Sequence, residues 1–392
     1  LELVIETEVP APYLPAMLLY SITLSKAALE KYGPLYNTKV ETSVSCGPFK
    51  LSEWVKDQSV TIVKNEKYTG TLQAPVEKLV LKLADSGSTF QMYQNNEIDY
   101  MAGGPPASLT IMQSDDKTKA EIHSGVADFP TWYIFFDVTL DPWKDIKVRQ
   151  AWSHAIDRDT LEKAVLGPNG VPAYSWLAPG FPGNQTDALK DIQAFDPAKA
   201  KQLLADAGFP DGKGFPKQQM WLRAPTPLDQ AVAGALAAMI KQNLNIDVEL
   251  VPHDQPGFTA ALHAKPTQIP LGYVRYGMDY LDPSNMLGVW KSGGRHSWSN
   301  PEYDKELAAA SAFLGDPAER IKMFQAAEKI LVEDVPAVFI YHGREVQYIK
   351  PWLKGEFIAP DSHNISAVHW PGYTTMTEIP SELYIGSDAP NR

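Results

Sequence analysis

One short segment of this 392-residue sequence places a carboxylate among aromatic side chains, a combination suited to ligand binding. The segment is YVRYGMDYLDPSNMLGVW, residues 273–290, in which Asp279 stands between Tyr276 and Tyr280. A carboxylate in such surroundings can bind the ammonium or hydroxyl groups of a ligand, while the rings cover its apolar parts. The alternative is structural, with Asp279 organising a turn and Asp282 capping the following helix. The residues alone leave both interpretations open.

A second carboxylate raises the question of catalysis. Asp85, Ser86 and Gly87 follow apolar residues at 79–83, as in the catalytic loop of an aspartic-type hydrolase. That chemistry needs two aspartates that share one proton, and the sequence contains no second Asp-Ser-Gly or Asp-Thr-Gly. We therefore expect a strand at 79–83, with Asp85 or Ser86 capping a short helix that ends near Asn95.

The composition argues against several classes of function. The net charge is -12 and no run of Lys and Arg occurs, so we expect no nucleic-acid partner. Cys46 is the only cysteine, which excludes an internal disulfide and a cysteine-based metal cluster. The eight histidines are scattered, and no nucleophile elbow, phosphate-binding loop or His-Glu-x-x-His motif is present. We expect no catalytic residue, no metal site and no cofactor.

The elements that must position these residues alternate between strands and helices, without repeats or low-complexity linkers. This order predicts an α/β fold with mixed β-sheets flanked by helices. The clearest helix signal lies at 196–208, where Asp196 caps the helix, Pro197 occupies its first turn and Gly208 ends it. The other expected elements are a hairpin over 48–55 and 59–64, a buried strand at 131–138, one or two helices over 148–167, a strand–helix–strand unit at 218–223, 228–243 and 246–251, a strand at 273–276, helices at 301–314 and 317–333, and a strand at 336–341.

Five motifs are each only modestly informative, but their occurrence in one order is specific for a known family. They are SCGPFKLSEWVKDQSVTIVKNEKY, NNEIDYM, DIKVRQAWSHAIDRDTL (145–161), FDPAKAKQLLADAGFPDGKGFP (195–216) and YGMDYLDPSNML. In this order the chain resembles the family 5 extracellular solute-binding proteins of bacterial ABC importers, the oligopeptide- and dipeptide-binding group. The segment around Asp85 is similar to a strand–turn–helix of that family's fixed lobe, in which the aspartate is a turn residue.

The resemblance implies a two-lobed periplasmic-binding-protein-like fold (type II, cluster C), with a ligand held between the lobes. It implies a fixed lobe at 1–137, incomplete because its N-terminal part is missing, a second α/β lobe at 138–349, and a return segment at 350–392. Cys46 and Asp137 replace a small residue and an Asn that are usual in the family, and we expect neither change to disturb function.

The resemblance also implies a ligand site in the segment described first. In peptide-binding members the residue matching Asp279 pairs with the α-ammonium of the peptide. The strand matching Arg275 to Gly277 adds main-chain hydrogen bonds to the peptide. The backbone thus supplies the affinity, and the pockets for the peptide's side chains accept many residue types. Gly277 would also permit close approach of another backbone. The expected ligand-binding residues are Arg275, Tyr276, Gly277, Asp279, Tyr280 and Trp290.

The signature segment VRQAWSHAIDRDTLEKAVLG carries two arginines whose roles are separable. We expect Arg149 to be a structural tether rather than a ligand contact, and Arg158 to lie near the surface or in an ion pair. The residues expected to face the interior are Ala151, Ala155 and Ile156.

The implied function is that of a non-enzymatic, extracytoplasmic binding protein, in the periplasm or at the outer face of the cell membrane. A monomer would capture oligopeptides and deliver them to the permease subunits of an ABC transporter, with the membrane reached only through a lipid anchor on the missing N-terminal part. An oligosaccharide-binding receptor of the same family is the alternative, since ten Trp could stack sugars. The aspartic-type hydrolase rests on Asp85 alone.

Overall fold

The protein is described by a computed structural model over residues 3–18, 23–71, 75–105, 107–125, 128–355 and 383–390. By its contacts the chain divides into a larger unit, Leu1–Leu18 with Asp128–Arg344, and a smaller unit, Leu19–Ala127 with Glu345–Arg392. The sequence predicts boundaries after residues 137 and 349, whereas the structure divides the chain after residues 127 and 344. The structure also assigns residues 1–18 to the larger unit, and the sequence predicts them in the same lobe as the residues that follow. Within the larger unit, Tyr13 of this first segment stacks on Tyr280.

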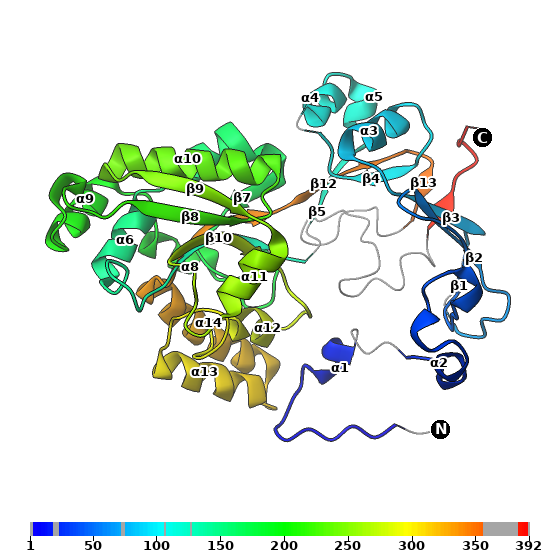
Figure 1. Ribbon diagram of the computed structural model, residues 1–392, viewed down its shortest axis with the longest axis horizontal. Coiled ribbons are helices and arrows are strands. Elements are labelled where there is room, and N and C mark those ends of the chain that lie inside the picture. Colours follow the sequence, from blue (N-terminus) through cyan, green and yellow to red (C-terminus); the bar gives the residue numbers. More distant parts are fainter. Residues whose placement is uncertain are drawn as a thin grey trace. The chain divides into compact units, whose positions relative to one another are not determined.

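The larger unit is built on a six-stranded mixed sheet (Figure 1) with the order β7-β11-β6-β10-β8-β9. Strand β10 pairs antiparallel with β6 and parallel with β8, and β8 is parallel to β9. The helix between β8 and β9 makes this the predicted β-α-β unit, because parallel neighbours need a crossover connection. The strands are β6 (Thr131–Phe136), β7 (Gly170–Pro172), β8 (Gln218–Arg223), β9 (Val248–His253), β10 (Leu271–Tyr276) and β11 (Ala337–Gly343).

Helices cover both faces of this sheet, as the buried and largely apolar β6 requires (Figure 1). On β6, Ile134 and Phe136 pack with side chains of α6, α9 and α10, whereas Tyr133 and Phe135 pack with those of α11 to α14. The α-helices of the unit are α1 (Leu14–Met17), α6 (Ile146–His154), α7 (Arg158–Leu161), α8 (Thr186–Leu189), α9 (Pro197–Asp206), α10 (Pro227–Leu244), α11 (Gln255–His263), α12 (Pro283–Gly288), α13 (Pro301–Ala312) and α14 (Pro317–Asp334).

The smaller unit contains the two local structures that the sequence predicted most directly. Strands β1 (Phe49–Val55) and β2 (Ser59–Lys64) form the expected hairpin. Asp85 caps α3 (Ser86–Gln94), because its Oδ1 accepts hydrogen bonds from the backbone nitrogens of Gly87 and Ser88, each at 3.0 Å. The remaining elements are α2 (Lys26–Tyr32), β3 (Lys78–Lys82), β4 (Tyr100–Ala102), α4 (Ser108–Gln113), α5 (Asp116–Lys119), β5 (Ile122–Gly125), β12 (Glu345–Ile349), β13 (Leu353–Lys354) and β14 (Tyr384–Ile385).

Arg149 on α6 is a structural tether, as predicted. Its Nε donates to the carbonyl of Val335 at 2.9 Å, its Nη1 to the carbonyl of Trp143 at 2.7 Å, and its Nη2 forms an ion pair with Asp334 at 3.1 Å. These bonds attach α6 to the end of α14. The three residues expected inside, Ala151, Ala155 and Ile156, are fully buried.

The prediction for Arg158 is wrong. This side chain is 1% exposed, and no ion pair includes it among the residues that the structure describes. Its Nε donates to the carbonyl of Phe339 at 2.7 Å and its Nη1 to the carbonyl of Gln193 at 2.8 Å. Burial lowers the pKa of Arg158 to about 10. Backbone carbonyls from distant segments thus satisfy this guanidinium without a carboxylate, which the local sequence could not reveal.

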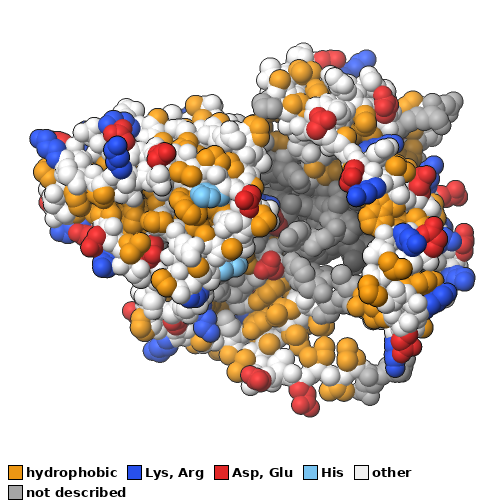
Figure 2. Space-filling view, viewed as in Figure 1, with side chains coloured by type: hydrophobic (Ala, Val, Ile, Leu, Met, Phe, Trp, Pro, Cys, Tyr) orange, Lys and Arg blue, Asp and Glu red, His pale blue; other side chains and the backbone are white. Residues whose placement is uncertain are grey.

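On the face shown in Figure 2, basic and acidic side chains are interspersed rather than gathered into a patch of one sign. Of the described helices, none is both long and apolar enough to cross a lipid bilayer. Within the same residues, no group of three or more His, Cys, Asp and Glu side chains could hold a metal ion.

Candidate functional site

Asp279 lies in the turn between β10 and α12 of the larger unit, where neutral donors fix its carboxylate. The hydroxyl of Tyr276 donates to Oδ2 at 2.6 Å, and Nδ2 of Asn285 donates to the same oxygen at 3.2 Å. In return, the backbone nitrogen of Asp279 donates to Oδ1 of Asn285 at 2.8 Å. Burial, followed by the hydrogen bond to Asp279, raises the pKa of Tyr276, so this hydroxyl remains a donor at neutral pH. The carboxylate is therefore held in one orientation while half-buried.

Asp279 has room for one more donor. Nearby ion pairs join Arg275 to Asp128 and Arg320 to Asp282, and none within the described ranges includes Asp279. An ionised carboxylate offers about four lone-pair sites, and the side chains of Tyr276 and Asn285 use two of them. Hydrogen bonds in which both partners are charged are the strongest available to such a group. The arrangement is suited to a cationic ligand group, such as an ammonium.

Asp282, three residues further on, has the structural role that was the alternative for this segment. Its Oδ1 accepts from the backbone nitrogen of Ser284 at 3.0 Å and so caps α12. Both of its oxygens also bind Arg320 of α14, at 2.6 and 3.0 Å, with both side chains 12% exposed. This bidentate pair fixes the start of α12 against α14, and it thereby places Asn285 beside Asp279.

Gly277 permits the close approach that its sequence position indicated. A Cβ atom there would lie 2.1 Å from Oδ2 of Asp128, and the carbonyl of Asp128 accepts from the backbone nitrogen of Met278 at 2.7 Å. The same Asp128 carboxylate pairs with Arg275 at 3.2 Å. A side chain at position 277 would have to displace the Asp128 carboxylate, so Gly277 keeps the turn that carries Asp279 close to the start of β6.

The main chain of Arg275 is already partly engaged. Its carbonyl accepts a hydrogen bond from Nη2 of Arg223 at 3.2 Å. On the other side, β10 is paired with β6 through Arg275 opposite Trp132 and Tyr276 opposite Thr131. A peptide strand that added to β10 here would share the Arg275 carbonyl with Arg223, or would displace that guanidinium.

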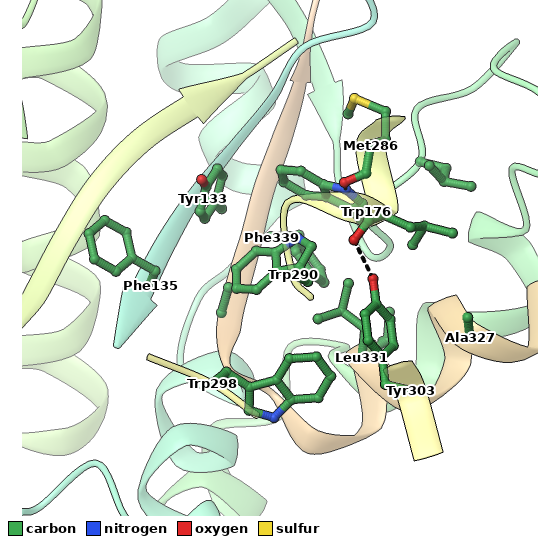
Figure 3. Packing of buried hydrophobic residues seen from close by; sticks show 14 of the residues in the cluster. Tyr133, Phe135, Trp176, Met286, Trp290, Trp298, Tyr303, Ala327, Leu331 and Phe339 are labelled. Carbon is green, nitrogen blue, oxygen red and sulfur yellow. Dashed lines mark hydrogen bonds between the residues drawn. The ribbon is translucent and has the colours of Figure 1, made fainter. Parts of the chain in front are cut away.

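Tyr280 lies next to Asp279 in the turn, whereas Trp290 lies in the core. The ring of Tyr280 stacks on Tyr13 with ring centroids 5.7 Å apart, and its hydroxyl lies 3.4 Å from Oγ of Ser284. Trp290 is 1% exposed and packs in the core against Trp176 and Phe339 (Figure 3). Trp290 is thus corrected from a ligand contact to a core residue, because rings from β6, β11 and two loops surround its indole.

The structure adds residues that sequence reasoning missed. Asn285 positions Asp279, Asp128 neutralises Arg275, and Tyr13 covers Tyr280. The guanidinium of Arg295 lies over the Tyr276 ring, 5.3 Å from its centroid. Asn285 could have been found, because a polar side chain in the first turn of a helix often bonds the residues before it. The other three come from distant parts of the chain and leave no local signal.

Comparisons with known proteins agree with this fold. The sequence profile described as bacterial extracellular solute-binding proteins, family 5, middle region, matches residues 1–298. The chain is 26% identical over 344 residues to the dipeptide-binding protein DppE of Bacillus subtilis, covering 83% of this chain and 60% of that protein. It is 28% identical over 360 residues to the periplasmic oligopeptide-binding protein OppA of Salmonella typhimurium, covering 88% and 64%.

A solved structure gives the same result. The periplasmic oligopeptide-binding protein OppAIV of Borrelia burgdorferi, a component of an oligopeptide ABC transporter, superposes with a TM-score of 0.74 at 26% identity, over 96% of this chain and 72% of that one. The predicted α/β, periplasmic-binding-protein-like fold is confirmed. The chain spans less than two thirds of the length of the two relatives named above.

Proposed function

Because the chain belongs to the bacterial extracellular solute-binding proteins of family 5, we propose that it binds peptides outside the cytoplasm and passes them to the permease of an ABC importer. Relatives that bear the names of dipeptide- and oligopeptide-binding proteins support this choice of ligand and compartment. Members of this group bind solutes and are not enzymes, and we extend that role to this chain.

The orientation of Asp279 is the observation that carries the proposal. A half-buried carboxylate that neutral donors hold in place is a fixed point for the α-ammonium of a peptide. Tyr276, Gly277, Tyr280 and the backbone of Arg275 surround it and complete the proposed ligand site. Since every peptide with a free amino terminus carries this ammonium, the site would accept many sequences.

The sugar-binding alternative loses much of its support. It rested on the abundance of Trp, and a stacking Trp must be accessible to a sugar ring. The buried tryptophans are Trp143, Trp152, Trp176, Trp290 and Trp298. Each of these contributes to the core of the larger unit, so these five of the ten tryptophans cannot stack on a sugar.

Calorimetric titration of Asp279→Asn tests the proposal. With a tripeptide that has a free amino terminus, we expect the substitution to weaken binding by roughly 2–4 kcal/mol, because it leaves the ligand ammonium without its charged partner. The same tripeptide with an acetylated amino terminus should bind wild type and variant equally weakly. Asp187→Asn is the matched control, since Asp187 is exposed on α8 in the same unit.

Two results would contradict the proposal. One is equal affinity of the wild type for the free and the acetylated tripeptide, which would show that no ammonium is recognised. The other is cleavage of a peptide by the wild type that disappears in Asp85→Ala, which would revive the hydrolase. Measurement with an oligosaccharide in parallel distinguishes the sugar receptor, for which Asp279→Asn should cost only about 1 kcal/mol because an acceptor remains.

A further inference from the structure

Glu328 of α14 carries a buried carboxyl outside the turn that holds Asp279. The residue is 0% exposed, and the groups that bond its carboxyl are all donors. Oε1 accepts from the backbone nitrogens of Trp176 at 2.9 Å and Leu177 at 2.7 Å, and Oε2 accepts from Nε2 of Gln185 at 3.0 Å. Donors on both oxygens suit an ionised carboxylate, because a protonated carboxyl would direct its own hydrogen at one of them.

Trp176, the residue that Glu328 holds, is fully buried, and its backbone and its indole are both bonded. Its backbone nitrogen donates to Glu328, and its carbonyl accepts from Oγ1 of Thr131 at 2.9 Å. Its indole Nε1 donates to the carbonyl of Met286 at 2.7 Å, and the two residues lie side by side in Figure 3. Bonds from α14, β6 and α12 thus fix the position of this side chain.

The indole of Trp176 contacts both elements that orient Asp279. Its ring is stacked with the ring of Tyr276, with centroids 6.2 Å apart and planes 18° apart. Its bond to Met286 holds α12 next to Asn285. Tyr276 and Asn285 are the two side chains that donate to Oδ2 of Asp279. A displacement of the indole would therefore move both donors, and the carboxylate with them.

The ionisation of Glu328 changes how firmly Trp176 is held. Burial raises the pKa of Glu328 to about 7, although its hydrogen bonds oppose the rise. Both forms of the carboxyl are therefore populated near neutral pH. A hydrogen bond to a charged acceptor is roughly twice as strong as one to a neutral acceptor. The ionised form thus fixes the backbone of Trp176 more firmly than the protonated form does.

The other titratable groups of this network keep one form near neutral pH. Burial and the neighbouring Glu328 raise the pKa of Tyr303, on α13, well above its ordinary value. Burial raises the pKa of Tyr174, in the loop of Trp176, to about 12. Nδ1 of His342 lies 2.9 Å from Oγ1 of Thr131, and burial lowers the pKa of this histidine to about 3. The charged side chains on the adjoining helices are exposed or already bonded: Asp187, Asp282 with Arg320, Asp304 with the backbone of Ser292, and Lys329 with Glu333.

We propose that Glu328 is a positioning residue for peptide binding: through Trp176 it fixes the two side chains that orient Asp279, most firmly when it is ionised. This inference rests on the proposed peptide-binding function. A carboxylate that is already held in its binding orientation loses less entropy when the ligand arrives. Peptide affinity therefore rises with pH as Glu328 ionises, whereas the stability of the larger unit falls over the same range.

Calorimetric titration of the wild type and Glu328→Gln between pH 5.5 and 8 tests the inference, with a tripeptide that has a free amino terminus. Glutamine keeps an acceptor oxygen for Trp176 but carries no charge at any pH. The two proteins should bind equally at pH 5.5, and the wild type should bind about fivefold more tightly at pH 8. The ammonium of the peptide titrates alike with both proteins and cancels in the ratio of affinities. A ratio that stays constant across this range overturns the inference.

A double-mutant cycle separates positioning from a general effect on the fold. If Glu328 acts through Asp279, adding Glu328→Gln to Asp279→Asn should not weaken binding further at pH 8. Losses that simply add would overturn the inference. Glu333→Gln is the control on the same helix, because Glu333 is exposed in a pair with Lys329, and its affinity should follow that of the wild type at every pH. A thermal melt shows that each variant is folded at the temperature of the titration.

Nuclear magnetic resonance of the ligand-free wild type decides the inference where Glu328→Gln fails to fold or no peptide binds. The signals of the Trp176 indole N–H and the Asn285 side-chain amide should shift together with pH, with a midpoint at about 7. The indole signal of Trp54, exposed on β1 of the smaller unit, is the control and should not follow this titration. Signals of Trp176 and Asn285 that stay fixed overturn the positioning role. Joint shifts without peptide binding support that role and refute the proposed function alone.

Discussion

Replacement of Glu328 by glutamine should change how the stability of the larger unit depends on pH. Glu328 lies on α14 and is 0% exposed. Its Oε1 accepts hydrogen bonds from the backbone nitrogens of Trp176 at 2.9 Å and Leu177 at 2.7 Å, and its Oε2 accepts from Nε2 of Gln185 at 3.0 Å. The carboxyl thus fixes the loop after β7 to α14. Burial raises the pKa of Glu328 to about 7, although these hydrogen bonds oppose the rise.

The sign and the size of the effect follow from this pKa. The ordinary pKa of the carboxyl is 4.5, so the folded protein holds the proton more tightly than the unfolded chain does. The stabilising contribution is therefore complete below pH 4.5 and is lost as the pH rises through about 7. A pKa raised from 4.5 to about 7 corresponds to roughly 3 kcal/mol at pH values above both.

Urea denaturation of the wild type and Glu328→Gln between pH 4.5 and 8 measures this contribution. The amide oxygen of glutamine still accepts from the backbone nitrogens of Trp176 and Leu177. Its amide nitrogen cannot accept from Gln185, which must reorient, and the resulting loss of stability does not vary with pH. Relative to the variant, the free energy of unfolding of the wild type should fall by roughly 3 kcal/mol across the range. Buried histidines titrate alike in both proteins and cancel in the difference.

Glu333→Gln provides the control on the same helix, because Glu333 is exposed in a pair with Lys329. Its stability should follow that of the wild type at every pH. Parallel curves for the wild type and Glu328→Gln would refute the reasoning, since they would mean that Glu328 does not change its ionisation between the folded and unfolded states in this range.

Three further substitutions have outcomes that the structure specifies. Arg149→Ala should lower the free energy of unfolding by about 3 kcal/mol, because it removes the ion pair to Asp334 and takes the donor away from several carbonyls, and loss of peptide binding at unchanged Tm would contradict its role as a tether. Gly277→Ala should destabilise the larger unit by roughly 1–3 kcal/mol in thermal denaturation, because the methyl group would displace Asp128; an unchanged Tm would show that the turn is loose. Asp85→Ala should reduce stability only slightly, through loss of an exposed cap, and should leave ligand binding unaltered in calorimetry.

Local chemistry allowed much of this protein to be predicted from its sequence. Asp85, Asp196 and Asp282 cap helices because a short carboxylate reaches the free backbone nitrogens of the first turn, an interaction that depends only on neighbouring residues. The hairpin over β1 and β2 and the β8–α10–β9 unit follow from alternation and from apolar spacing in the same way. The aspartate at position 279 could be selected as a candidate because its aromatic neighbours are adjacent in sequence.

Only the tertiary structure decided which candidates share a surface. Trp290 and Arg158 lie inside the larger unit because distant segments enclose them: aromatic rings from β6, β11 and the loop after β7 in the first case, backbone carbonyls in the second. Tyr13 meets Tyr280, and Arg295 meets Tyr276, through contacts that neither periodicity nor capping encodes. An arginine has the same local signature whether its guanidinium forms an ion pair, donates to backbone carbonyls or lies over an aromatic ring. Its role is set by the acceptors that the folded chain brings around it, and these come from elsewhere in the sequence.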